Sequence, residues 1–328
     1  MTTMKAIRLT GPTAAEDLHP VDVPVPEPRP GWVRVAVKAF GVNESEVTSR
    51  RGQSSPDFSF PRILGIECVG VVDAVDVSST LTVGQQVATM MGGMGRGWDG
   101  SYAEYVLVPE DQLITFTSDL PWEVLGALPE MLQTAHGSLH RALRLDPGQT
   151  LLVHGGTSTV GLTATSLAHN MGATVLATSR KSENRLLLEH VGADHVVIDD
   201  DTLAEQVSVI CPNGLDAVLE LVGADALPAT LALLKPGGIG CFTGALNGHW
   251  TLGDVSPFEL VPVGVRLTTY AGEASDLDEA SFDGYLKAIA AGSITPVTSA
   301  VYRGLARVGQ AHHDLEHDRR PGKCVVVL

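Results

Sequence analysis

The residues best suited to bind a ligand form a turn of small side chains directly after the apolar residues 151–153. His154 and Gly155 lead into a G-x-S-x-x-G pattern, which consists of Gly156, Thr157, Ser158, Thr159, Val160 and Gly161. A dinucleotide pyrophosphate needs backbone N–H groups and a positive helix end, and only small side chains let the backbone come that close. Ser158 stands where a middle glycine is usual; its hydroxyl can still donate to phosphate but leaves less room. The turn predicts a dinucleotide site, and a purely structural strand-to-helix turn is the alternative.

A second candidate site lies about twenty residues beyond this turn, at Ser179, Arg180 and Lys181. An acidic residue here would hold the ribose of NAD, but this chain has a hydroxyl and two cations instead. These groups suit the 2′-phosphate of NADPH, which they can bind through charge-assisted hydrogen bonds. Because the chain has 22 Lys+Arg against 38 Asp+Glu, two adjacent cations favour this interpretation over a solvated basic turn. We therefore predict NADPH as the cofactor.

The turn at 156–161 and the residues 179–181 both lie within a series of alternating strand and helix patterns, which are the elements that hold them in place. The pattern predicts βαβ units around a parallel sheet, with a helix stop and turn at residues 235–238. The expected strands are 150–154, 174–178, 195–199, 215–220 and 239–243, and the expected helices are 160–171, 183–190, 202–210 and 227–234. Short apolar alternations such as Val33, Val35 and Val37 predict β structure in the first third. A helix near 285–291 and a closing strand at 324–328 are expected in the tail.

Composition limits the class of protein. A length of 328 residues suggests two domains, and a net charge of −16 argues against nucleic acid and anionic membranes as partners. No apolar run approaches the ~20 residues of a membrane span or forms a signal peptide, so we expect a cytoplasmic protein. The four cysteines lie far apart and form no zinc-ligand pair. His313, Glu316 and His317 match an H-x-x-E-H metal motif, but their charged surroundings favour a solvated helix end.

The sequence resembles the medium-chain dehydrogenase/reductase superfamily, and within it the zinc-free quinone oxidoreductase branch. The likeness spans nearly the whole chain and rests on the order and spacing of short motifs. They are Gly41-Val42-Asn43, Leu64-Gly65-Ile66-Glu67, Val83-Gly84-Gln85-Gln86-Val87, Gly100-Ser101-Tyr102-Ala103-Glu104-Tyr105, Thr134-Ala135, the turn at 154–161, Leu234-Lys235-Pro236-Gly237-Gly238 and Gly322-Lys323. The resemblance implies an α/β fold with a doubly wound Rossmann domain at 123–264. A mainly β, GroES-like catalytic domain at 1–122 would be completed by 265–328.

The resemblance also implies which residues form the active site. The positions of the zinc ligands in zinc-dependent members correspond to Asn43, Ile66, Glu67 and Glu130, which cannot assemble a tetrahedral zinc site, so no metal is expected. Asn43 and Thr134 are the expected catalytic residues, with Asn43 orienting the acceptor oxygen or the nicotinamide ribose; a structural turn role for Asn43 is the alternative. The residues expected beside the nicotinamide, or counted with the cofactor site, are Phe242, Thr243, Gly244 and Tyr270.

Three functions remain open. The first is NADPH-dependent hydride transfer to a small-molecule acceptor that is already electrophilic, a quinone or an α,β-unsaturated carbonyl compound. The second is an NADP-dependent alcohol dehydrogenase with an unrecognised metal site, and the third is a nucleotide-binding protein with a structural or regulatory role. By analogy with relatives, we expect a homodimer that pairs through the apolar segment 265–270.

Overall fold

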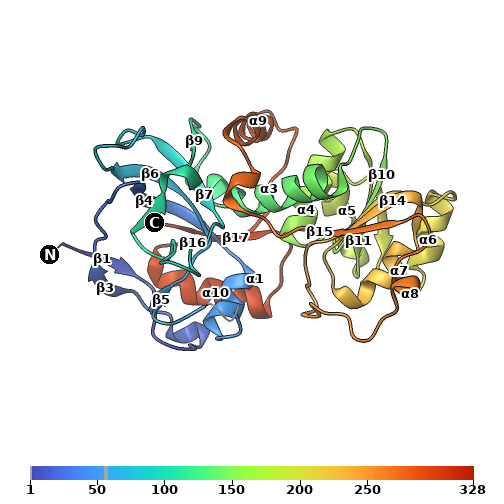
Figure 1. The fold of residues 1–328 in the computed structure, drawn as a ribbon, viewed down its shortest axis with the longest axis horizontal. Helices are drawn as coiled ribbons and strands as arrows, with labels where there is room; N and C mark the ends of the chain where they lie inside the picture. Colours follow the sequence, from blue (N-terminus) through green and yellow to red (C-terminus); the bar gives the residue numbers. More distant parts are fainter. Residues whose placement is uncertain (1, 55–57) are drawn as a thin grey trace. The chain divides into compact units, whose positions relative to one another are not determined.

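The computed structural model describes residues 2–54 and 58–328, and the chain divides into two compact units (Figure 1). Unit 1 comprises Met1–Gln133, Glu273–Ala290 and Pro296–Leu328, and unit 2 comprises Thr134–Gly272 and Ala291–Thr295. No helix in the described part of the chain is long and apolar enough to cross a membrane.

Unit 2 is a Rossmann domain built on a six-stranded sheet in which every pairing is parallel. The order in the sheet is β12 (His195–Ile198), β11 (Thr174–Ser179), β10 (Thr150–His154), β13 (Leu215–Glu220), β14 (Leu234–Phe242) and β15 (Arg266–Thr269). The order therefore reverses between β10 and β13, which is where such sheets bind dinucleotides. Its core includes Leu152, Leu176, Val197 and Val218, one from each of four neighbouring strands.

Helices connect these strands as the alternating pattern predicts. The predicted ones are α4 (Thr159–Asn170), α5 (Arg185–His190), α6 (Leu203–Ile210) and α7 (Leu227–Leu231). In addition, α8 (Pro257–Leu260) connects β14 to β15, and the π-helical segment η3 (Gly137–Leu143) precedes β10. The helix predicted over 227–234 ends earlier, and residues 235–238 belong to β14 instead of a turn. The reason is that Leu234 already pairs with Leu215 on β13. The next pair is Ala217 with Ile239, so residues 235–238 lie in an irregularity of the strand register.

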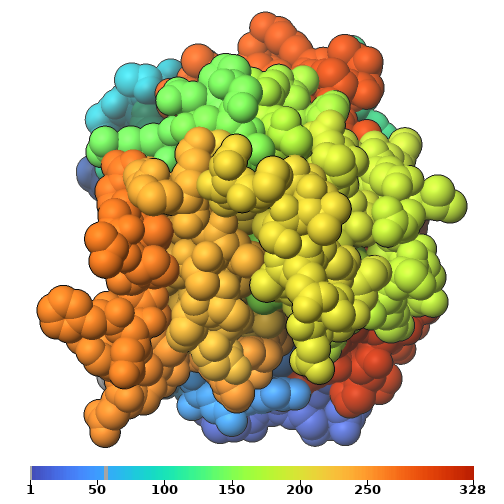
Figure 2. All heavy atoms as spheres, turned by 90° about the vertical axis from the view of Figure 1, so that its right-hand side faces the viewer, coloured from blue at the N-terminus to red at the C-terminus, as the bar shows by residue number. Residues whose placement is uncertain are grey.

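The edges of unit 2 differ from the limits 123–264 taken from the sequence. Residues 123–133 fall in unit 1, and β15 extends unit 2 beyond 264 because it pairs in parallel with β14. The segment before β15 carries exposed apolar side chains, among them Phe258 at 97% and Val263 at 98% exposure. Figure 2 shows this part of the chain, in orange, protruding from one face of unit 2.

Unit 1 is mainly β, in agreement with the expected GroES-like domain. Its described residues form a seven-stranded sheet around the long strand β4 (Trp32–Val42), and β16 (Thr298–Arg303) and β17 (Lys323–Val327) belong to this sheet. The other members are β6 (Glu67–Ala74), β7 (Gln86–Met90), β8 (Tyr105–Pro109) and β9 (Ile114–Phe116). Two small pairs join β1 (Thr3–Ala6) to β3 (Val21–Pro24) and β2 (Arg8–Leu9) to β5 (Arg62–Ile63).

The β4 strand shows why this unit forms a sheet. Val33, Val35 and Val37 are buried while Arg34 is only partly so, which confirms the period-two pattern. The helices that contribute to unit 1 are α1 (Glu44–Arg50), α2 (Trp122–Leu125), α9 (Glu279–Ala290), α10 (Val308–His317) and the first part of α3 (Leu128–His136). Strand β17 lies antiparallel to β4 and pairs Cys324 with Val42, so the chain's last strand meets the point where α1 begins.

Candidate functional site

The predicted phosphate turn lies at the carboxyl ends of the central strands of unit 2. Residues 155–158 connect β10 to α4, and Ser158 is the N-cap of that helix. The first amides of an α-helix have no acceptor within the helix, so the N–H groups of Thr159 and Val160 suit an anion placed at this end. The structure thus brings the strand, the turn and the helix N-terminus together as a dinucleotide site requires.

Ser158 closes this turn rather than leaving its hydroxyl for a ligand. Its Oγ donates to the carbonyl of Gly155 at 2.8 Å and accepts from the N–H of Gly161 at 3.0 Å. The hydroxyl proton is therefore already used, and donation from Ser158 to phosphate would require breaking the Gly155 contact. This local role of Ser158 differs from the phosphate contact considered in the sequence analysis.

The glycines of the turn are required by close backbone approach. A Cβ on Gly161 would lie 2.3 Å from the carbonyl oxygen of Gly155 and 2.9 Å from backbone atoms of Gly156. A Cβ on Gly156 would lie 2.9 Å from the carbonyl oxygen of Thr178 on β11. The tight packing of α4 against the sheet explains why small residues stand at these positions.

The predicted phosphate clamp lies just beyond β11. Arg180 and Lys181 are exposed, and the Lys181 ammonium lies 3.4 Å from Glu183 in an exposed ion pair. Such a pair is worth little in water, so both cations can turn to an anionic ligand. Ser179 is buried, and its hydroxyl donates to the Lys181 carbonyl and accepts from the N–H of Lys181. Ser179 therefore shapes the turn, and the two cations present the charge.

A buried ionic network that sequence reasoning missed links three strands beneath the phosphate turn. His154 is the last residue of β10; its Nδ1 lies 2.8 Å from Glu220, its neighbour on β13, and its Nε2 lies 3.1 Å from Asp199 after β12. Glu220 is fully buried and also accepts from the Val222 N–H and the Thr230 hydroxyl. Burial lowers the pKa of His154, but its bonds to Asp199 and Glu220 outweigh this and raise the pKa to about 9.

The residues expected beside the nicotinamide gather at the ends of β14 and β15. The N–H groups of Thr243 and Gly244 both point at the Glu220 carbonyl, at 3.0 and 3.3 Å, and the Tyr270 N–H bonds the Phe242 carbonyl. The Thr243 hydroxyl lies 3.0 Å from that of Ser138 on η3. The Tyr270 ring packs on Gly137, where an added Cβ would lie 2.0 Å from the ring hydroxyl. Within unit 2 these predicted residues therefore form one cluster.

Thr134 and Asn43 belong to different units. Thr134 is half-buried near the C-terminal end of α3, at the start of unit 2. Asn43 lies in unit 1, where it directly follows β4 and is the N-cap of α1. Their expected catalytic roles stay predictions, and the surroundings of Asn43 are described next within its own unit.

Asn43 is held in a cluster of charged side chains in unit 1. Its Nδ2 donates to Glu67 Oε1 at 3.0 Å, and its Oδ1 accepts from the ammonium of Lys323, the first residue of β17. The same ammonium lies 2.6 Å from Glu67 and 2.9 Å from Glu130. Glu67 and Lys323 are fully buried, so these charges compensate one another out of contact with water.

Glu46 completes the cluster on the side of α1. Its carboxylate accepts from the N–H groups of Asn43 at 2.9 Å and Ile66 at 3.0 Å. Burial raises the pKa of Glu46 to about 7, with a smaller contribution from Glu67, although the Ile66 bond opposes it. The cluster thus holds three carboxyl groups and one ammonium, and one of the carboxyl groups binds a proton near neutral pH.

Sequence reasoning quoted Lys323 and His154 within motifs but assigned neither of them a role. Lys323 is a charged residue at the start of the apolar strand K-C-V-V-V, and His154 ends the apolar strand T-L-L-V-H. The sequence did contain a signal for both residues, because each is a titratable side chain at the end of an apolar strand. Such a side chain needs a charged or hydrogen-bonding partner when it is buried. The partner itself was not visible, since Glu130 lies 193 residues from Lys323 in the sequence.

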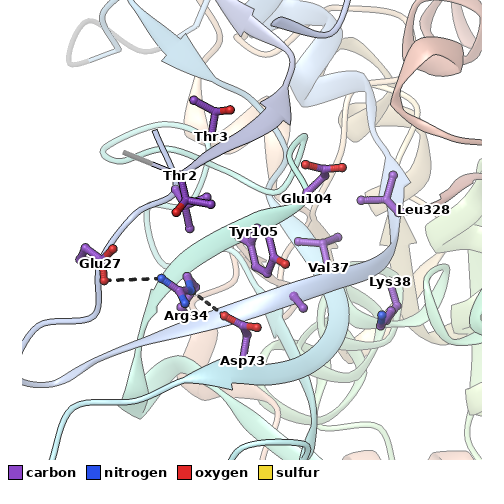
Figure 3. A pocket seen from close by; sticks show the side chains of 12 residues that line it. Thr2, Thr3, Glu27, Arg34, Val37, Lys38, Asp73, Glu104, Tyr105 and Leu328 are labelled. Carbon is purple, nitrogen blue, oxygen red and sulfur yellow. Dashed lines mark hydrogen bonds and ion pairs between the residues drawn. The ribbon is translucent and has the colours of Figure 1, made fainter. Parts of the chain in front are cut away.

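Unit 1 also contains a cavity of about 510 Å³ (Figure 3). Arg34 on its wall donates to Asp73 at 2.7 Å and lies 3.7 Å from Glu27. Neither Asn43 nor Lys323 lines it. Because Arg34 is already paired with Asp73 and Glu27 on this wall, we place no functional site there.

Comparisons with known proteins agree with both halves of this description. Residues 29–118 match the family described as alcohol dehydrogenase GroES-like domain, and residues 159–288 match the family described as zinc-binding dehydrogenase. Quinone oxidoreductase from Mus musculus is 29% identical over 321 residues, which are 94% of this chain and 92% of that protein. 2-Haloacrylate reductase from Burkholderia sp is 30% identical over 277 residues, 79% of this chain and 80% of that protein. The structure of mycobacterial Rv1454c complexed with NADPH is similar with a TM-score of 0.85 at 29% identity, covering 99% of this chain and 100% of that chain.

The zinc in one of these family names does not fit the residues of this chain. Within residues 2–54 and 58–328, no group of three or more His, Cys, Asp and Glu side chains is arranged to hold a metal ion. At the positions that the resemblance relates to zinc ligands, an ammonium already lies between Glu67 and Glu130. Zinc in proteins is typically bound by thiolates and imidazoles, and this cluster contains neither.

Proposed function

Because the chain belongs to the medium-chain dehydrogenase/reductase superfamily of oxidoreductases, we propose that it is an NADPH-dependent reductase of quinones or α,β-unsaturated carbonyl compounds that works without zinc. When bound, the reduced nicotinamide supplies a hydride to an acceptor that is already electrophilic, so no Lewis acid is needed.

The observation that carries the proposal is the composition of the cluster around Lys323. Oxidation of an alcohol requires a group that lowers the pKa of the hydroxyl, and zinc supplies this in metal-dependent members. Here Asn43, Glu67 and Glu130 surround an ammonium, with no thiolate or imidazole among them. This arrangement favours acceptors that do not need activation over alcohols. The printed names of the relatives, quinone oxidoreductase and 2-haloacrylate reductase, support the same class of acceptor.

The choice of NADPH over NADH is supported by the tip of β11. Arg180 and Lys181 are exposed there, and Ser179 fixes the turn that presents them. A 2′-phosphate placed at this tip would gain two charge-assisted contacts, whereas the ribose hydroxyl of NADH would find no carboxylate at the strand end to bind it. The complex of mycobacterial Rv1454c with NADPH also agrees with this choice.

The reaction is tested by following NADPH oxidation at 340 nm with p-benzoquinone, cyclohexenone and a saturated ketone, each with and without a chelator. We expect reduction of the quinone or the enone at a rate that the chelator does not change. Alcohol oxidation with NADP⁺ that stops when metal is removed would support an alcohol dehydrogenase instead. Tight NADPH binding with no acceptor reduced would support the third function, a nucleotide-binding protein with no enzymatic turnover.

The cofactor is tested with Arg180→Ala. Loss of one charge-assisted contact costs about 1.5–3 kcal/mol, so we expect the KM for NADPH to rise roughly 10- to 100-fold while that for NADH changes little. Arg185→Ala is the matched control, because Arg185 is also exposed but lies on α5, where it pairs with Glu189. Equal changes for the two cofactors in Arg180→Ala would refute the phosphate assignment.

A further inference from the structure

The ammonium of Lys323 has a complete set of hydrogen-bond partners inside unit 1. An ammonium donates three hydrogen bonds, and three oxygens receive them: Asn43 Oδ1, Glu67 Oε1 at 2.6 Å and Glu130 Oε2 at 2.9 Å. The Lys323 side chain is only 1% exposed and that of Glu67 is 0% exposed. A buried cation with every proton bound in this way is a fixed charge.

The partners come from separate parts of the fold. Asn43 directly follows β4, Glu67 begins β6, Glu130 lies on α3 and Lys323 begins β17. Burial lowers the pKa of Lys323, but Glu130 and Glu67 outweigh it and raise the pKa above its usual value. The charge thus ties together four elements of the unit.

The cation also determines how the Asn43 amide is oriented. Because Oδ1 accepts from Lys323, Nδ2 must point the other way, toward Glu67 at 3.0 Å and Glu46 at 3.4 Å. Close packing leaves little room for a substitute cation here. An added Cβ at Gly41 would lie 2.2 Å from the Lys323 side chain and 2.3 Å from Glu67 Oε1.

We propose that Lys323 is a tethered cation that stands where metal-dependent relatives place their zinc, and that it is a positioning residue whose charge orients the Asn43 amide and pairs with Glu67 and Glu130. Two carboxylate oxygens and an amide oxygen form a shell of hard ligands, and a cation supplied by the chain itself already occupies that shell. The chain therefore supplies a cation of its own to this group of carboxylates. Only the kinetic part of the inference rests on the proposed reductase function.

The first test removes the charge and keeps the length, with Lys323→Met. Breaking a buried ion pair from one side leaves Glu67 uncompensated, and we expect the melting temperature to fall by roughly 10 °C. In the double variant with Glu67→Gln both charges are absent, and we expect at least half of that loss to return. Lys287→Met is the control, because its lysine is 77% exposed and pairs with Asp283 on the surface. A purely additive loss in the double variant would overturn the inference.

The second test asks whether charge or shape is needed for turnover. We expect Lys323→Met and the double variant to lose at least tenfold in kcat, with the KM for NADPH unchanged because the cofactor turn lies in unit 2. In Lys323→Ala, methylammonium is expected to restore kcat and melting temperature, whereas tetramethylammonium, which cannot donate hydrogen bonds, is not. The inference would be overturned if Lys323→Met kept the kcat of the wild type. It would also be overturned if methylammonium and tetramethylammonium restored the kcat of Lys323→Ala equally.

The two proposals can fail separately. If the wild-type protein reduces no quinone or enone, the melting temperatures of the single and double variants still decide whether Lys323 is the tethered cation. If Lys323→Met does not fold, recovery of folded protein in the double variant supports the inference, and failure of the double variant as well refutes it. If the wild type reduces quinones but the stability losses of Lys323→Met and Glu67→Gln are simply additive, the proposed function is supported and the cation proposal is refuted.

Discussion

The His154 network predicts a specific loss of stability at alkaline pH. Its pKa is raised from 6.5 in the unfolded chain to about 9 in the folded protein, where the side chain is 5% exposed. The folded state therefore holds the proton more tightly. The resulting stability is fully present below pH 6.5 and is lost as the pH rises through 9. At 1.36 kcal/mol per pH unit, a rise of the pKa from 6.5 to about 9 corresponds to about 3 kcal/mol of stability.

The comparison needs a variant in which both charges of the His154–Glu220 pair are absent. Replacing His154 alone would leave Glu220 as a buried uncompensated charge. In His154→Asn/Glu220→Gln, neutral amides replace the ion pair, and the glutamine carbonyl can still accept from the Val222 N–H. In the wild type, the bond to His154 holds the pKa of Asp199 below its usual value, so Asp199 stays ionised across the alkaline range. In the amide variant that bond is lost, but the ordinary pKa of an aspartate, about 4, still lies well below pH 6.

The assay is urea unfolding followed by circular dichroism between pH 6 and pH 10. We expect the free energy of unfolding of the wild type to fall by about 3 kcal/mol more than that of the amide variant over this range. His195→Asn is the control, since His195 is exposed at the start of β12. If the curves of wild type and amide variant stay parallel within 1 kcal/mol, the charged His154 network is refuted.

Three further predictions follow from the site and the sheet edge. Gly161→Ala, with its Cβ 2.3 Å from the Gly155 carbonyl, should cost about 1–3 kcal/mol in urea unfolding and raise the KM for NADPH at least tenfold, whereas Gly253→Ala, which meets open space, should change neither. The pKa of Glu46 rises from 4.5 in the unfolded chain to about 7 in the folded protein, so the free energy of unfolding should fall by about 3 kcal/mol as the pH rises from 4.5 to 7. In Glu46→Gln, urea unfolding should show a smaller fall over this range, and an unchanged fall would contradict the buried position of the carboxyl group. We propose that the edge strand β15 pairs with that of a second copy, so light scattering should give twice 34.5 kDa; a monomeric wild type would refute this, and Thr269→Pro should shift the mass toward the monomer.

The sequence predicted unit 2 well because its signals are local. The central strands β10 and β11 are short apolar runs, α6 is amphipathic, and the G-x-S-x-x-G turn stands where β10 meets α4. The observed bounds 150–154 and 215–220 of two strands confirm the predicted ones. The start of β14 was misplaced because glycine and proline at 236–238 indicate a turn locally, whereas pairing of Leu234 with β13 decides the outcome.

The charged partners within each unit could not be predicted in the same way. Lys323 lies 280 residues from Asn43 in the sequence, and His154 lies 66 residues from Glu220, so no periodicity connects them. Their contacts exist because strand pairing brings the ends of β17 and β4, and of β10 and β13, side by side. The hydroxyls of Ser158 and Ser179 were expected to bind the cofactor, but each donates to a nearby backbone carbonyl instead. Residue type alone does not show which of these partners a hydroxyl will take.

The placement of β17 has a consequence for biosynthesis. Unit 1 requires residues 296–328, whereas residues 134–295 supply the whole of unit 2. A ribosome therefore releases every part of unit 2 before β17 can pair with β4, and domains commonly fold as they emerge. Until then, Glu67 and Asn43 in the nascent chain lack the ammonium of Lys323 as a partner. The backbone of residues 39–42 in β4 also lacks its β17 partner, which leaves an unpaired edge of the kind that chaperones bind.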